Sequence, residues 1–534
     1  MKFSLYYHTL KYLKGRQIAF RIFYALRRLF RKFTGFRYEL ERTPATVHDI
    51  AFLPSLPSQV SWIPQDNTFT FLNRAHTFGE RINWRFGDFG KLWTYNLHYF
   101  EYLHGAHISK DEGLQLMRDF ISQLPQTPEA LEPYPTALRI IFWIRFIAEH
   151  GIEDARIDAS LYAQSYILAD QVEYHLMGNH LLEDGFGLFF AAYRFGDVGL
   201  YRKAVGIILR ELDEQILPDG GHFERSPMYH QIILYRVLDC LNLSRSNQGV
   251  FQENITAVLE KKAALMLGWL RQIAFRNGAI PLFNDSAFDI APSVPSLLEY
   301  GNRLEVTARE VPLQESGYRK LAGTRYELVA DVGEIGPDYI PGHAHSDTLS
   351  FELYIDGKPF IVDTGTSTYE KNERRQYERS TAAHNTVQID GAEQTEIWGG
   401  FRVARRARPV MMEERENVIR ASHTGYDLLG VRHIRTFSAE SNSIQITDEV
   451  APLKKGQSME RHTCFAYLHF HSDVVFTKQG TDFLQTAHAR IDLKGCTSLA
   501  LIDYEYAPAF NTRVPARKAV IAFHDTLKIT LRIV

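Results

Sequence analysis

The densest group of residues that could do chemistry is the segment GHAHSD, which holds His343, His345 and Asp347. In an extended segment, side chains two residues apart project from the same face, so these three would point together. Asp363 ends an alternating segment, and His384 follows in AAHNT. Two imidazoles and one carboxylate from separate strands form a suitable shell for zinc. The spacing therefore predicts a metal site in this part of the chain.

A second group lies in the first half of the chain. Asn179 and His180 open an apolar segment with helical spacing, and the stretch DGGHFERSPMYH follows at 219–230. That stretch contains His222, Glu224, Arg225, Tyr229 and His230. Each of these residue types often caps or packs a helix end. All of them are expected at the loop ends of a helical array, and a groove would lie at those ends.

One reaction uses such a set of groups. β-Elimination next to a uronic acid needs a neutralised carboxylate, a base for the C5 proton and an acid for the departing glycosidic oxygen. An amide or a neutral imidazole serves the first need, and tyrosine and histidine serve the others. Glycoside hydrolysis needs a pair of carboxylates instead. Glu224, Asp285 and Asp347 are present, but no sequence spacing pairs them.

The elements that must position these residues change in kind along the chain. From about residue 90 to 310, apolar residues recur at i, i+3, i+4 and i+7, which predicts helices. The predicted helices cover 92–103, 135–150, 160–176, 179–196, 201–217 and 229–243. Loops with Gly, Pro, Asn or Asp separate them. Repeated helical hairpins of this kind indicate a solenoid or a toroid.

After about residue 320 short alternating segments predict strands. The clearest is LSFELYIDGKPFIVDTG at 349–365, in which Asp356 and Gly357 are typical of a two-residue hairpin turn. Further strands are expected in 385–396, 443–450, 473–480 and 527–534. We therefore predict an α+β multidomain protein in which an antiparallel β-sandwich follows the helical half. The expected parts are a basic segment at 1–45, a helical domain at 46–315 and a sandwich at 316–534.

Composition excludes several classes of protein. The 534 residues are 45% hydrophobic and 23% charged with a net charge of −3, so disorder, coiled coil and a nucleic-acid-binding polycation are excluded. Aromatic residues reach 13%, which suits stacking on sugars as well as core packing. Three cysteines are too few and too scattered for a disulfide frame. Neither a Walker loop nor a complete GxGxxG motif is present, so nucleotide-dependent chemistry has no support.

The N-terminal segment is strongly basic. Residues 1–42 hold eleven Lys or Arg against two Glu, a charge of +9 that leaves −12 for the rest of the chain. No signal-peptide core and no apolar run of transmembrane length occurs, so we expect a cytoplasmic protein. Residues 17–33 interleave aromatic and basic residues at helical spacing. Two interpretations stay open: peripheral contact with an anionic membrane, or packing on the acidic body of the same chain.

Several motifs in order resemble the heparinase II/III-like polysaccharide lyases. They are GNHLLEDG, DGGHFERSPMYH, GHAHSDTLSFEL, VDTGTSTY, AHNTVQIDG and WGGFRVARRA, between about residues 90 and 410. The resemblance implies an incomplete (α/α) toroid followed by an antiparallel β-sandwich. It also implies cleavage of a uronic-acid-containing glycan by β-elimination.

The same resemblance implies roles for individual residues. Asn179 is similar to the carboxylate neutraliser, with His180 as a nearby helper or base. Tyr229 is similar to the acid for the leaving oxygen, and His343 to a second acid or base. The implied metal ligands are His345, Asp363 and His384, around a structural divalent metal, expected to be zinc. The implied groove residues are Arg139, Trp143, Glu224, Asn284 and Tyr369.

The N-terminus and the WTYNLHYFEYL motif resemble a subgroup associated with bacterial surface-polysaccharide clusters. The expected partner is therefore a uronic-acid-containing polysaccharide or a lipid-linked oligosaccharide, and no nucleic acid. Three alternatives stay open. A uronyl C5-epimerase would use the same residues, a glycan-binding protein would not need all of them, and a metallohydrolase would activate water at the His/Asp cluster.

Overall fold

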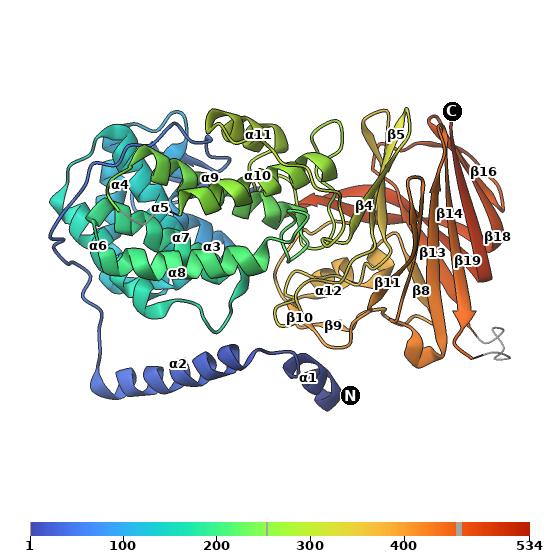
Figure 1. Ribbon diagram of the computed structural model, residues 1–534, viewed down its shortest axis with the longest axis horizontal. Coiled ribbons are helices and arrows are strands. Elements are labelled where there is room, and N and C mark those ends of the chain that lie inside the picture. The colour runs from blue at the N-terminus through green and yellow to red at the C-terminus, as the bar shows by residue number, and fades with distance from the viewer. Residues whose placement is uncertain (1, 252–254, 455–461) are drawn as a thin grey trace.

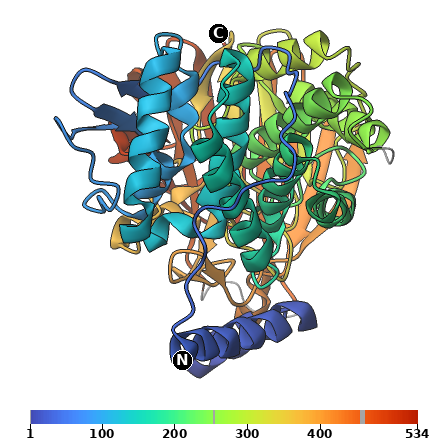
Figure 2. The same cartoon turned by 90° about the vertical axis from the view of Figure 1, so that its left-hand side faces the viewer.

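The computed structural model describes residues 2–251, 255–454 and 462–534, and it divides into a helical half and a strand-rich half (Figure 1). The helices of the first half lie side by side in pairs (Figure 2). They are α3 (Lys91–Tyr99), α4 (Lys110–Gln123), α5 (Pro133–His150), α6 (Ala155–Gln171), α7 (Gly178–Phe195), α8 (Val198–Gln215), α9 (Pro227–Ser246), α10 (Thr256–Ile273) and α11 (Val294–Arg303). The predicted helices are confirmed, with ends that differ by a few residues.

α5 and α7 form the centre of this half, because most of their residues are buried. α7 packs against α5 and α8, and nearly all of its residues are buried. Side-chain caps fix where the neighbouring helices begin. The Asp197 carboxylate accepts a hydrogen bond from the Leu200 amide at the start of α8, and the Ser226 hydroxyl accepts from the Tyr229 amide in α9. The Ser226 cap therefore fixes the start of α9, the end of that helix that carries Tyr229.

Several elements of the first half were not predicted: the helices α4, α10 and α11, and a small sheet. A three-stranded antiparallel sheet of β1 (Ser61–Ile63), β2 (Thr68–Phe71) and β3 (Arg74–Thr77) precedes the helices. It packs Trp62, Phe69 and Phe71 against Tyr102 and Trp93. Its strands are three or four residues long, which is too short for an alternating pattern to register.

The second half contains two antiparallel sheets that pack face to face. A four-stranded sheet consists of β4 (Tyr318–Ala322), β5 (Tyr326–Asp331), β6 (Phe351–Ile355) and β7 (Lys358–Ile361). The ten-stranded sheet contains β8 (Val387–Ile389), β11 (Pro409–Arg415), β12 (Val418–His423), β13 (Val431–Ala439), β14 (Ser443–Pro452), β15 (Cys464–His469), β16 (Phe476–Gln479), β17 (Phe483–Thr486), β18 (Ala489–Ala509) and β19 (Thr512–Ile533). A shared core joins them, including Leu328 and Phe351 on one sheet and Phe437 and Ile529 on the other. The toroid followed by a β-sandwich is the predicted fold class.

The predicted hairpin turn is confirmed in detail. Asp356 and Gly357 join β6 to β7, and their φ angles are 51° and 73°. Two left-handed residues in succession match the twist of the flanking strands, and aspartate followed by glycine tolerates them best. α11 ends at Arg303 and β4 begins at Tyr318, on either side of the expected domain boundary.

Smaller elements join the two halves. A short helix, α12 (Glu373–Glu378), and the two-residue strands β9 (Ile397–Trp398) and β10 (Arg402–Val403) lie in the sandwich half near the helical domain. The first two helices, α1 (Lys2–Leu10) and α2 (Gly15–Thr34), lie along the outside of the molecule (Figure 1). Among the described residues, no helix is long and apolar enough to cross a membrane.

Candidate active site

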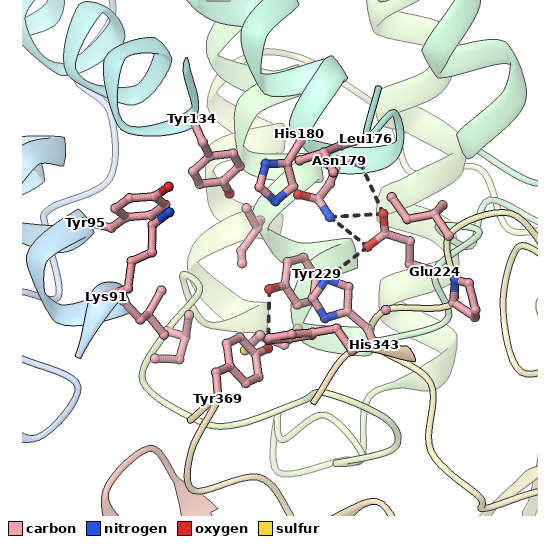
Figure 3. A pocket seen from close by; sticks show the side chains of 18 of the residues that line it. Lys91, Tyr95, Tyr134, Leu176, Asn179, His180, Glu224, Tyr229, His343 and Tyr369 are labelled. Carbon is pink, nitrogen blue, oxygen red and sulfur yellow. Dashed lines mark hydrogen bonds and ion pairs between the residues drawn. The ribbon is translucent and has the colours of Figure 1, made fainter. Parts of the chain in front are cut away.

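A cavity of about 970 Å³ opens between the helical half and the sandwich half. The six residues of greatest chemical interest on its wall come from both halves. They are Asn179, His180, Glu224, Tyr229, His343 and Tyr369 (Figure 3). Every one of them was predicted as a catalytic or groove residue. The structure thus brings together side chains from four separate segments of the chain.

Asn179 lies at the start of α7 and faces Glu224. The Nδ2 atom of Asn179 donates to both carboxylate oxygens of Glu224 at 3.0 and 2.9 Å, and its backbone amide donates to Oε1 at 3.1 Å. Both residues are buried. The preceding Gly178 has a φ of +61°, and a Cβ there would stand 2.8 Å from Glu224 Oε1. The pair therefore requires glycine at position 178.

Tyr229, in the first turn of α9, lies against His343 from the sandwich half. The two rings are 3.9 Å apart between centroids and inclined by 33°. The Tyr229 hydroxyl lies 3.3 Å from the hydroxyl of Tyr369. Burial, followed by the proximity of Tyr369 and of the Asp285 carboxylate, raises the pKa of Tyr229 well above its usual range. The phenol is therefore held in its protonated form.

His343 is oriented by a buried carboxylate. Its Nδ1 atom lies 2.9 Å from Asp285 Oδ2, and its Nε2 atom faces Glu224 Oε2 at 3.6 Å. An Nδ1–H that donates to Asp285 leaves Nε2 with a lone pair in the neutral ring. The Nε2 atom is thus the one that can accept a proton on the cavity side.

Asp285 joins several cationic and polar groups. It accepts from His343, from His345 Nε2 at 2.9 Å and from both terminal nitrogens of Arg375, with Nη2 at 2.7 Å. Burial alone would raise the pKa of Asp285, but Arg375 and the two histidines hold it well below its usual range. A fixed anion at this point sets the orientation of both rings in the HxH motif.

His180 stands beside Asn179 on α7 and turns toward the helical half. Its Nδ1 atom lies 2.8 Å from Glu173 Oε2, and its ring packs 4.6 Å from that of Tyr134. Burial disfavours the imidazolium, but Glu173 outweighs this effect, so the pKa of His180 is raised. The protonated, imidazolium form of His180 is therefore favoured at the edge of the cavity.

Three residues with left-handed backbone adjoin the site. Met177, Arg225 and Asn284 have φ values of 66°, 56° and 56°. Met177 lies two residues before Asn179. Arg225 directly follows Glu224, and Asn284 directly precedes Asp285. Residues other than glycine adopt this conformation at a cost, and such residues gather at functional sites.

The sequence profile described as Heparinase II/III N-terminus matches residues 144–302, and the profile described as Heparinase II/III-like, C-terminal matches residues 306–533. The chain belongs to the heparinase II/III-like family. The two matches include Asn179, Glu224, Tyr229, His343 and Tyr369, whereas the cavity-lining residues before residue 144 lie outside them. The family fold, a toroid followed by a β-sandwich, is the one described above.

Two curated relatives of this family are called heparin-sulfate lyase. The protein of Bacteroides stercoris is 26% identical over 319 residues, which is 53% of this chain and 45% of that protein. The protein of Bacteroides thetaiotaomicron is 25% identical over 34% of this chain and 32% of its own length. The match thus spans less than half of either relative.

Solved structures share the fold. Heparinase III aligns with a TM-score of 0.63 at 16% identity, over 85% of this chain and 79% of that chain. Heparan sulfate lyase HepC of Pedobacter heparinus aligns with a TM-score of 0.55 at 17% identity, over 86% and 79% of the two chains.

Three predicted groove residues lie away from the cavity wall. Arg139 and Trp143 are fully buried in α5, where the Arg139 guanidinium donates to Gln164 and to the His98 and Ala130 carbonyls. Asn284 is buried too. Its Nδ2 atom donates to the Arg225 carbonyl, and its Oδ1 atom accepts from the His345 amide. These three residues position backbone and core, so the expectation that they line the groove is wrong.

The predicted metal ligands form a buried cluster beneath the cavity. His384 Nδ1 lies 2.6 Å from Asp363 Oδ2, and the His345 and His384 rings are 5.2 Å apart between centroids. Among the described residues, no group of three His, Cys, Asp or Glu is arranged at metal-binding geometry. His345 Nδ1 and His384 Nε2 are nevertheless buried without a hydrogen-bond partner in the described part of the chain. Two free imidazole nitrogens beside a carboxylate fit a divalent metal, so zinc stays a prediction.

Other residues of the site were missed. Arg375 lies in the hydrophilic stretch KNERRQYERS, where nothing distinguishes one arginine from the next. Lys91 and Tyr95 line the cavity and both contact Glu132. Lys91 lies just before the WTYNLHYFEYL motif, and Tyr95 lies within it. The polar residues of that motif at helical spacing were the signal that could have indicated a cavity wall.

Proposed function

We propose that this protein is a polysaccharide lyase that cleaves a uronic-acid-containing glycan by β-elimination. The observation that carries the proposal is the pairing of a protonated Tyr229 with a His343 whose Nε2 is turned to the cavity. The family relationship and the names of the two curated relatives support the same reaction class.

In the first step His343 acts as the base. Its Nε2 lone pair takes the C5 proton of the uronate, and the C5–H electron pair moves toward the carboxyl group. Asp285 stabilises the imidazolium that forms, because its carboxylate stays ionised and accepts the Nδ1–H. The orientation of the base therefore depends on a residue that is not proposed to touch the sugar.

In the second step Tyr229 acts as the acid. The electron pair forms the C4–C5 double bond, the C4–O bond breaks, and the phenolic proton passes to the departing oxygen. A phenol with a raised pKa stays protonated until a strong base, the leaving alkoxide, develops beside it. The imidazolium of His343, at stacking distance, is the proton source that restores the phenol through solvent.

Asn179 is the proposed neutraliser of the uronate carboxylate. Its amide nitrogen carries two N–H groups, and one N–H directed between the Glu224 oxygens accounts for both contacts. The second N–H is then available to the negative charge that grows on the substrate carboxylate. Glu224 fixes the amide orientation, so we place it as a positioning residue.

The substrate is proposed to be a uronic-acid-containing polysaccharide or a lipid-linked oligosaccharide. Arg21 of α2 and Arg402 of β10 both line the cavity, and neither has a carboxylate partner among the residues that the structure describes. Cations at the wall without such partners suit an anionic glycan.

We propose in addition that the protein binds a structural zinc ion. His345, Asp363 and His384 would hold it, and the ion would fix the loops that carry His343 and His384 rather than activate water. His384→Ala should lower both bound zinc, measured by elemental analysis, and the melting temperature. Full zinc content in that variant would contradict the proposed ligand set.

The experiment that tests the reaction is ultraviolet absorbance of the protein mixed with a panel of uronic-acid glycans. A 4,5-unsaturated uronate gives a new absorbance band, which should appear with at least one glycan and be absent for Tyr229→Phe. If no band forms on any member while C5 deuterium enters from heavy water, the protein is an epimerase. If a glycan binds and neither signal appears, it is a glycan-binding protein.

A further inference from the structure

α2 carries an apolar face that the rest of the protein does not cover. Its exposed apolar residues follow one another at helical spacing. They are Ile18, Ile22, Leu26, Leu29, Phe30 and Phe33. Their exposed fractions run from 44% at Ile18 to 91% at Phe33. Exposed apolar residues in such a stripe mark an interaction surface rather than ordinary surface variation.

The opposite side of α2 holds the helix on the body. Gln17 donates to the Leu176 carbonyl, the Tyr24 hydroxyl donates to the Val172 carbonyl, and Arg27 and Arg31 pair with Asp170. Surface helices of globular proteins normally direct the apolar stripe to the core. Here a polar stripe faces the protein, and the apolar stripe faces away from it.

Basic side chains flank the apolar stripe. α2 contains six Lys or Arg and no acidic residue. Arg28 and Lys32 are exposed, and no ion pair involves either of them within the described ranges. α1 extends the same character, with Phe3, Tyr7 and Leu10 exposed by 86%, 60% and 55%. The surface is therefore apolar at its centre and positive at its edges.

We propose that α1 and α2 form a membrane-binding surface that lies in the plane of an anionic bilayer. The apolar stripe would enter the boundary between headgroups and acyl chains, and Arg28 and Lys32 would contact lipid phosphates. A second copy of the chain is a poorer partner, because two such faces would bring like charges together. The partner is thus identified by the combination of apolar area and positive charge.

The position of the surface links it to the cavity. Leu10, Leu13, Gln17 and Arg21 belong to the cavity wall, so the membrane-binding helices also form one side of the proposed active site. If the proposed function holds, a glycan attached to a lipid would reach the cavity along this side. Membrane binding itself does not depend on that function.

Vesicle flotation tests the proposal. The full-length protein is mixed with vesicles of phosphatidylglycerol and phosphatidylcholine, or of phosphatidylcholine alone. We expect flotation with the anionic vesicles and loss of most binding in high salt. The double variant Leu26→Asn/Phe30→Asn should bind about tenfold or more weakly. The matched control is Leu428→Asn, which removes a 79% exposed leucine from the sandwich half and should bind normally.

Two results would overturn the proposal. One is equal flotation of wild type and double variant. The other is no flotation of the wild-type protein with anionic vesicles. A dimer seen by sedimentation that the double variant loses would then show that the face joins two copies. Both variants should keep the wild-type melting temperature because their side chains are solvent-exposed. Both should also keep wild-type turnover of a detached glycan, which separates this test from that of the lyase.

Discussion

The ring of His343 packs against the ring of Tyr229 at a centroid separation of 3.9 Å, and the two residues come from different halves of the chain. The acid and base of the proposed reaction are therefore complete only when the sandwich half is docked on the toroid. Since the cavity lies at the same boundary, substrate binding and catalytic assembly depend on one interface.

The first prediction concerns the Tyr229 hydroxyl. Tyr229→Phe removes one oxygen and should lower kcat about 10²–10⁴-fold, because the proposed proton donor to the leaving oxygen is lost. The melting temperature should change little. Tyr369→Phe is the matched control: it removes the neighbouring hydroxyl and should cost about tenfold or less. An active Tyr229→Phe protein would rule out the proposed acid.

The second prediction concerns Asn179. Asn179→Ala should lower kcat about 10²–10³-fold with a smaller change in KM, because the amide acts most strongly on the charge that develops during reaction. Steady-state kinetics on a glycan that the wild type cleaves would measure both constants. A rise in KM alone would mean that Asn179 only binds the ground state.

The third prediction concerns Asp285. Asp285→Asn leaves the buried Arg375 without its counter-ion and should lower the free energy of unfolding by about 3–5 kcal/mol, measured by denaturant titration. Arg375→Met should cost a similar amount, since it leaves Asp285 without its counter-ion. A double variant that costs less than the sum of the two would confirm that they act as a pair. Strictly additive losses would contradict it.

The fourth prediction concerns pH. The pKa of His180 is raised above 6.5, and Glu173, Glu224 and Glu183 are the acidic groups that raise it. The contribution of His180 to the free energy of unfolding is present in full below the pKa that His180 has in the unfolded chain. It is lost as the pH rises through the higher pKa that His180 has in the folded protein. The stability difference between wild type and His180→Gln should therefore be larger at about pH 6 than at about pH 9. A difference independent of pH would show that His180 is not charged in the folded protein.

Local patterns predicted much of the fold. The helical spacing located α5, α7, α8 and α9, and the Asp356–Gly357 dipeptide located the β6–β7 hairpin, because periodicity and turn chemistry act within a few residues. The motif resemblance located Asn179, Tyr229 and His343, which all line the cavity. Their catalytic roles stay predictions.

Long-range partners could not be predicted from spacing. Asp285 and Arg375 are 90 residues apart, and only the docking of the two halves brings them together. Arg139 and Trp143 have residue types common in sugar grooves, but both are fully buried. The residues of α5 that line the cavity are Tyr134 and Leu138. In the N-terminal segment, α2 packs on the body of the chain by its polar side and leaves its apolar side exposed. Contact of that side with a membrane stays a proposal.

The central claim is elimination, and isotope analysis of the products tests it most directly. A glycan that the protein cleaves is digested in H₂¹⁸O, and the new chain ends are examined by mass spectrometry. In digestions shorter than the exchange of the anomeric oxygen with water, elimination predicts an unsaturated uronate at the new non-reducing end and no ¹⁸O in either product, because the C4–O bond breaks without water. A saturated non-reducing end, with one ¹⁸O atom incorporated per cleavage at the new reducing end, would show hydrolysis and contradict elimination.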